Sequence, residues 1–242
     1  MNTFWKTIGE YNAATWIFQL LIIIAGIVLT IVLKRRQSRH AMAAMKIFLI
    51  FTYLWIAIGY YLICCSERSY NIVLAIFWCT LAAAWIWDLI TGYTQLEYNP
   101  RYRILAYILL VMPLIYPVIS IMRGLHFPEI TSPVMPCSVV TFTIGLLLLF
   151  HKKVNLFIIL LMCHWSLIGL SKTYFFGIPE DYILASASVP ALYLFFKEYF
   201  LCDLHKDTKP KAKYINLLLI VVCVVICLIL MGTMFYELMK DV

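Results

Sequence analysis

Residues 14–33 read ATWIFQLLIIIAGIVLTIVL and contain no charged side chain. Their length matches the roughly 20 apolar residues with which an α-helix crosses the hydrocarbon core of a bilayer. A basic cluster of Lys34, Arg35, Arg36 and Arg39 follows at once. Such a cluster stops transfer through a membrane, and the run lacks the small-residue cleavage pattern of a signal peptide. We therefore expect this stretch to form a first transmembrane helix.

The residues before this helix have a different character. Phe4 and Trp5 stand beside the charged residues Lys6 and Glu10. Aromatic side chains mixed with charges are typical of a helix that lies at the membrane surface. Residues 1–12 are therefore predicted to form a short interfacial helix, with the two aromatic rings at the depth of the headgroups.

The rest of the chain repeats the apolar pattern of residues 14–33. The sequence of 242 residues is 64% hydrophobic and 13% charged, whereas soluble domains are about 45–50% apolar and about 25% charged. This composition argues against a soluble enzyme, a nucleic-acid-binding domain and a secreted disulfide scaffold. We predict an all-α polytopic integral membrane helix bundle, a single transmembrane domain over residues 1–242 with about eight transmembrane helices. The seven further apolar segments are 42–64, 71–93, 104–122, 136–151, 154–176, 182–200 and 214–236.

The positive charge of the chain is unevenly distributed among the connectors. The formal net charge is +7, and fourteen of the nineteen lysines and arginines, Lys46 included, fall between helices 1–2, 3–4, 5–6 and 7–8. Short loops rich in these residues stay in the cytoplasm, so both termini of an eight-helix bundle lie outside. The basic residues are then expected to meet anionic lipid headgroups. The predicted partner is therefore the lipid bilayer, with no role in binding nucleic acid.

Two ionisable residues are predicted to lie within the membrane. Asp88 falls near the cytoplasmic end of the third helix, and His164 falls close to the middle of the sixth. Ionisable groups are costly in a bilayer and often functional there, so this pair could relay protons or bind a cation. A structural role is the alternative for each, with Asp88 at a helix end and His164 donating a hydrogen bond to a neighbouring helix.

Polar residues with chemical potential gather in the loops predicted to lie outside. The loop between the fourth and fifth helices offers His126 and Cys137, and its three prolines restrict its backbone. The turn before the seventh helix offers the adjacent carboxylates Glu180 and Asp181. An imidazole, a thiol and two carboxylates could surround a transition metal. The alternative is that Glu180 or Asp181 caps the seventh helix.

Neither a metal site nor a disulfide framework follows from the spacing of these residues. The chain lacks ligand pairs such as C-x-x-C or H-x-x-x-H, so a metal is left open and no cofactor is predicted. Four of the eight cysteines, Cys79, Cys163, Cys223 and Cys227, fall within helices, where a free thiol behaves as a small apolar group. A bridge from Cys64 or Cys65 to Cys137 also stays open.

Several short motifs resemble a bacterial multi-pass membrane protein family that is catalogued only as a domain of unknown function. The resemblance covers about residues 10–200 and implies a seven-helix core over 1–200, with 201–242 adding a cytoplasmic loop and an eighth helix. It implies no reaction. Ser138 and Leu170 depart from the pattern, which has proline and glycine there. The matching motifs are Tyr11-Asn12 with Trp16, Gly124-x-His126-x-Pro128, Pro136-Cys137 with Thr141 and Gly145, Trp165-Ser166-x-x-Gly169, and Gly177-x-Pro179-Glu180-Asp181.

The resemblance and the outer loops together predict a candidate site and a location. We expect a protein of the bacterial inner (plasma) membrane that binds or passes a small molecule or ion through an outward-facing cavity. One alternative is an accessory or docking subunit with a protein partner or a homo-oligomeric assembly. Another is a membrane-embedded metal or redox enzyme that uses His126 and Cys137; a role without catalysis is favoured. The candidate binding residues are Tyr11, Asn12, His126, Cys137, Trp165, Glu180 and Asp181.

Overall fold

The computed structural model describes residues 2–66, 70–150, 152–176 and 181–204. These residues form helices and connectors, with two isolated β-bridges and no strand among them, which confirms the all-helical class. The seven α-helices coincide within a few residues with seven of the predicted segments, except that α1 begins earlier and that α2 covers segment 42–64 only together with η1. The eighth predicted segment, 214–236, lies outside the described residues. The elements are α1 (Asn2–Arg35), α2 (Arg39–Trp55), the π-helix η1 (Ile56–Cys64), α3 (Asn71–Thr91), the 3₁₀ turn η2 (Pro100–Tyr102), α4 (Arg103–Met122), α5 (Pro136–Leu149), α6 (Leu156–Phe176) and α7 (Asp181–Leu204).

Within the described part of the chain, four helical stretches are long and apolar enough to cross a membrane, judged by length and composition. They are Phe4–Arg35, Arg39–Cys64, Asn71–Thr91 and Pro100–Met122. Helix α5 has 14 residues and ends before the predicted segment 136–151 does. At this length it rises about 21 Å. It is apolar all round and almost entirely buried, which is the pattern of a helix at the centre of a bundle.

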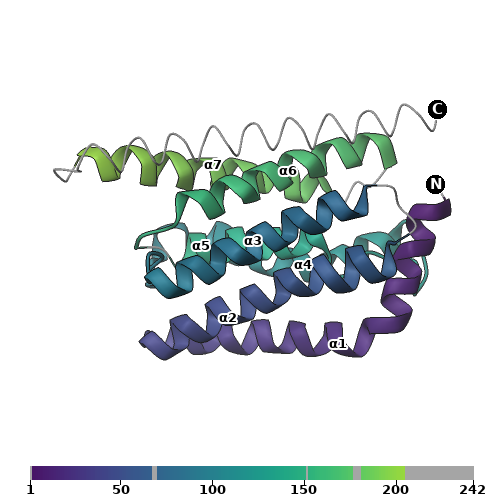
Figure 1. The fold of residues 1–242 in the computed structure, drawn as a ribbon, viewed down its shortest axis with the longest axis horizontal. Coiled ribbons are helices and arrows are strands. Elements are labelled where there is room, and N and C mark those ends of the chain that lie inside the picture. Colours follow the sequence, from purple (N-terminus) through teal and green to yellow (C-terminus); the bar gives the residue numbers. More distant parts are fainter. Residues whose placement is uncertain (1, 67–69, 151, 177–180, 205–242) are drawn as a thin grey trace.

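Helices α2 to α7 run alongside one another, with α5 among them (Figure 1). Helix α5 packs against α4, α6 and α7, while α2 packs against both α1 and α3. Two ends of the bundle are distinguished below. The loop end carries the connector 123–135 between α4 and α5, and the basic end carries Lys34 and the 92–99 connector.

Helix α1 bends sharply, so that its first turns cross the loop end and the remainder runs along the bundle (Figure 1). The crossing part corresponds to the interfacial helix predicted for residues 1–12, but it continues into the long helix without a break. Within this helix the Thr15 hydroxyl donates to the carbonyl of Tyr11 at 2.5 Å. Such bonds to the preceding turn often accompany helix bends.

Helix α1 is joined to α4 mainly near its two ends. At the basic end, Lys34 Nζ lies 5.1 Å from the centre of the Tyr107 ring and 5.8 Å from that of Tyr98. Both distances suit a cation–π contact. At the loop end the connector 123–135 lies between the two helices. The stretch of α1 between these contacts borders the cavities described next.

Candidate functional site

The connector 123–135 is fastened to α1 by buried side-chain amides. Asn12 Nδ2 donates to the carbonyls of Pro128 and Ile130 at 2.8 and 2.7 Å. Gln19 Nε2 donates to Asn12 Oδ1 at 3.2 Å, and Gln19 Oε1 accepts a short hydrogen bond from the Ser132 hydroxyl. All three side chains are buried. Because the contacts are satisfied within the protein, the connector is held in one position.

A second set of hydrogen bonds links the same connector to α1 again, through it to α2, and to α4. The Tyr11 hydroxyl donates to the carbonyl of Val134 at 2.8 Å and accepts from Trp55 Nε1 at 2.9 Å. The hydroxyls of Ser120 and Thr131 lie 2.7 Å apart. Tyr11 and Asn12, both predicted as binding residues, therefore position the loop that forms one wall of the site.

A groove of about 380 Å³ opens beside this network. Its volume falls at the lower end of the range of small-molecule sites, about 300–1,000 Å³, and its mixture of many apolar and few polar residues is typical of them. The apolar side chains Trp16, Leu20 and Phe127 at its rim are about half exposed. Its lining residues are Asn12, Trp16, Gln19, Leu20, Ile23, Pro117, Phe127, Ile130, Thr131, Ser132 and Pro133.

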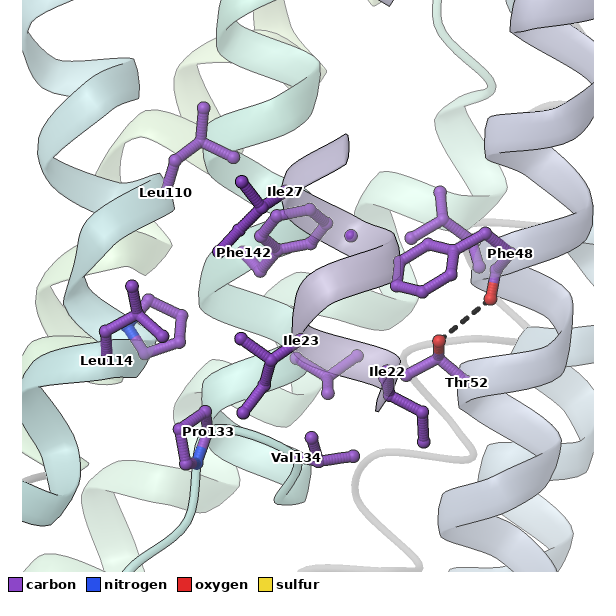
Figure 2. Close-up of a pocket in the computed structure, with 14 residues that line it drawn as sticks. Ile22, Ile23, Ile27, Phe48, Thr52, Leu110, Leu114, Pro133, Val134 and Phe142 are labelled. Carbon is purple, nitrogen blue, oxygen red and sulfur yellow. Dashed lines mark hydrogen bonds between the residues drawn. The ribbon is translucent and has the colours of Figure 1, made fainter. Parts of the chain in front are cut away.

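A narrower cavity of about 60 Å³ continues from the groove between α1, α2, α4 and α5. The two spaces share Ile23 and Pro133 as lining residues. The narrower cavity has one polar side chain, that of Thr52, whose hydroxyl donates to the carbonyl of Phe48 at 2.8 Å. Figure 2 shows its apolar side chains, which come from several helices: Ile22, Ile23, Ile27, Phe48, Leu110, Leu114, Pro133, Val134 and Phe142.

The residues predicted from the loops do not all lie together. Cys137 and Asp181, both buried, line a small cavity of about 30 Å³ at the loop end. This cavity shares Thr131 with the groove. His126 is exposed and lines neither space. Glu180 lies outside the described residues.

Trp165 lies in an aromatic cluster at the centre of the bundle. Its ring stacks on Phe77 at 5.4 Å and meets Trp78 edge-on at 4.9 Å. The cluster continues through Tyr61 and Tyr60 to Tyr11. Trp165 thus packs against α3 and η1 and lines none of the three cavities above.

Asp88 forms a buried ion pair that the sequence does not predict. Lys46 Nζ lies 2.7 Å from Asp88 Oδ2, and the two side chains are 5% and 0% exposed. Asp88 Oδ1 accepts from the backbone N–H and hydroxyl of Thr94 at 3.1 and 2.7 Å and from Asn155 Nδ2 at 3.3 Å. The prediction that Lys46 belongs to a basic connector is wrong, because this lysine lies inside α2 and is neutralised by Asp88.

The predicted partnership of Asp88 with His164 is not among the contacts found. His164 Nδ1 donates to the carbonyl of Leu160 at 2.8 Å, within its own helix. Asp88 instead links α2, α3 and the residues before α6.

The thiols and metal-binding side chains in the described part of the chain are dispersed. No group of three or more His, Cys, Asp or Glu residues is placed there to hold a metal ion. Cys64, Cys65 and Cys137 are not joined by a disulfide bond. The disulfide left open by the sequence therefore does not form in this structure.

Comparison with known families adds one finding. The model of a family of unknown function, DUF6064, matches residues 1–206. The chain belongs to this family. Neither the curated proteins nor the solved structures give a match. The resemblance to a domain of unknown function is thus confirmed, and the DUF6064 match contains every residue that lines the three cavities.

Two residues of the groove within this DUF6064 region were not singled out from the sequence. Gln19 is the single amide in the apolar run 14–33, and Ser132 lies between the prolines of the connector. A polar side chain inside an apolar helix is a signal that could have found Gln19, since such residues are costly in lipid. Ser132 carries no comparable signal, because serine is common in loops.

Proposed function

We propose that the protein is a multi-pass membrane protein that binds a small amphipathic molecule in the groove between α1, α4 and the connector 123–135. The observation that carries the proposal is the groove of about 380 Å³, with polar groups at the loop end and a continuing apolar cavity. Asn12, Gln19 and Ser132 fix the polar wall through buried hydrogen bonds. A preformed wall of this kind lowers the ordering cost of binding.

A membrane setting agrees with the surface of the bundle. The four long apolar helices carry large exposed side chains, such as Ile90, Ile104 and Met122, which are 74, 72 and 82% exposed. In lipid these side chains meet acyl chains and need no protein partner. By the distribution of basic residues, we propose a bacterial inner-membrane location with the loop end outside. The groove then opens in the outer half of the bilayer.

Binding is favoured over passage by what lies beyond the groove. The apolar cavity that continues from it is bordered by Val139 and Phe142 of α5. Helix α5 is buried along nearly its whole length by α4, α6 and α7. The small cavity with Cys137 and Asp181 adjoins the groove through Thr131. We propose that these two residues extend the polar end of the binding site.

The proposal can be tested by native mass spectrometry of the full chain purified in lipid nanodiscs. The variant Leu20→Trp places a large ring in the lining of the groove, whereas Leu21→Trp makes the same change at a residue that is 58% exposed and outside the lining. We expect the wild type and Leu21→Trp to retain a small non-protein molecule and Leu20→Trp to lose it. A wild type that carries nothing, or two variants that behave alike, would contradict the proposal.

A further inference from the structure

We infer that the molecule held in the groove is a single-chain lipid whose polar head donates hydrogen bonds, such as a long-chain alcohol or a monoacylglycerol. The inference rests on the proposed binding function and names the class of ligand. Two independent features carry it: the hydrogen-bonding capacity left in the polar wall, and the shape and lining of the apolar cavity.

The donors of Asn12, Gln19 and Ser132, the three side chains that fix the polar wall, are fully used within the protein. A side-chain amide has two N–H donors, and those of Asn12 go to the carbonyls of Pro128 and Ile130. Those of Gln19 go to Asn12 Oδ1 and Thr15 Oγ1. The single donor of Ser132 goes to Gln19 Oε1. None of these three side chains therefore has a donor left for a ligand.

The acceptors of the same side chains are only partly used. An amide oxygen has two lone pairs, and Asn12 Oδ1 and Gln19 Oε1 each accept one side-chain hydrogen bond. The orientation of the amides is fixed, because the two carbonyls facing Asn12 can only accept. A ligand group next to these oxygens must accordingly donate. A carboxylate or phosphate, which only accepts, would leave its charge uncompensated beside them.

The apolar part of the site matches a hydrocarbon chain. From Gln19 to Ile27 the axis of α1 advances about 12 Å, close to the roughly 15 Å of hydrocarbon in one leaflet. The cavity along this length is lined by apolar side chains, and its one hydroxyl, on Thr52, is already bonded. The cavity is narrow beside Gly26, where an added Cβ would lie 3.1 Å from Phe48 Cζ. The absence of a side chain at Gly26 therefore leaves this part of the cavity open. We assign one acyl chain to this space.

Photo-crosslinking of the full chain in nanodiscs tests the inference with two probes. One is a monoacylglycerol and the other a fatty acid, each with the same diazirine-bearing chain, used at a pH at which the carboxyl group is ionised. We expect the monoacylglycerol to label the Ile22–Ile27 stretch, and the fatty acid to bind about tenfold more weakly, as one uncompensated polar group predicts. The variant Ile23→Trp should abolish the labelling, and Ile24→Trp, at a residue outside the lining, should retain it.

The outcomes separate this inference from the proposed function. Equal labelling by both probes, blocked by Ile23→Trp, would overturn the donor-head assignment and leave the groove as a binding site. Labelling of the Ile22–Ile27 stretch no stronger than that of exposed Ile76 on α3 would overturn the assigned acyl chain. In either case a molecule lost only from Leu20→Trp would still support the proposed function. If Ile23→Trp fails to fold, Ile27→Trp and its control Val28→Trp ask the same question, because Ile27 lines the cavity and Val28 does not.

Discussion

At the scale of single residues, buried polar side chains decide where the connectors of this bundle lie. Asn12 and Asp88 occupy opposite ends, and each gathers several partners. A buried group that loses its partner costs about 1–3 kcal/mol, and more if it is charged. Substitutions at these two residues should therefore have larger effects than substitutions at the exposed positions around them.

The isosteric variant Asn12→Asp tests the network at the loop end. A carboxylate cannot donate to the carbonyls of Pro128 and Ile130, so we expect the free energy of unfolding to fall by about 1–3 kcal/mol. Thermal unfolding in detergent measures the loss, and hydrogen exchange should rise in residues 127–135. The matched control is Gln37→Glu, the same chemical change at an exposed residue. Equal melting temperatures for both variants would show that the amide does not hold the connector.

The ion pair at the basic end calls for a double-variant test. Lys46→Met leaves the buried carboxylate of Asp88 without its cation, which typically costs about 3–5 kcal/mol. The double variant Lys46→Met/Asp88→Leu removes both charges and should recover part of that loss. Lys152→Met, which breaks the exposed pair with Glu97, should cost at most about 1 kcal/mol. A double variant less stable than Lys46→Met would argue against a neutralised pair.

At the scale of elements, α4 packs closely against α5 on one face, and the cavities border α4 on the side of α1. Helix α4 packs closely on α5 through Gly145, where an added Cβ would lie 2.9 Å from both Leu109 Cβ and the backbone N of Leu110. Helix α4 contacts α1 through the Lys34–Tyr107 pair and is linked to it by the connector. The groove lies between α1 and α4 because α4 packs against α5 and not closely against α1.

Gly145→Ala tests the contact between α4 and α5. The methyl group has backbone as well as side chain in its way, so we expect a loss of about 1–3 kcal/mol from overpacking. Gly59→Ala is the control, because its nearest neighbours are side-chain atoms of Trp55 at 3.6 Å and beyond. In thermal denaturation, Gly145→Ala should have a melting temperature well below that of Gly59→Ala. The reverse order would contradict the close packing of these helices.

At the scale of the whole molecule, the position of the groove in the outer half of the bilayer depends on which end of the bundle faces outward. Alkaline phosphatase, which is active only outside the cytoplasm, can be fused after Gln37 at the basic end or after His126 at the loop end. We expect activity at His126 and none at Gln37, since basic connectors stay in the cytoplasm. A fusion to β-galactosidase should give the opposite pattern. Activity of the phosphatase at Gln37 would reverse the proposed orientation.

The helices could be predicted from the sequence because each depends on neighbouring residues. The apolar run 14–33 and the charges after it suffice to place most of α1. Neither the groove nor the buried ion pair could be predicted, because each depends on distant residues. Ser132 meets Gln19 across 113 positions, and Lys46 meets Asp88 across 42. Of the binding residues predicted from the outer loops, Cys137 and Asp181 line one cavity, whereas His126 is exposed. Composition does not distinguish the inner side of a loop from its outer side.

The most direct measurement is an experimental structure of the full chain in a lipid nanodisc, determined by electron cryo-microscopy with a bound antibody fragment. We predict an elongated density between α1 and α4 that begins beside Gln19 and Ser132 and passes Ile23 toward Phe48. Helix α1 packed directly against α4, with no space between them, would contradict it.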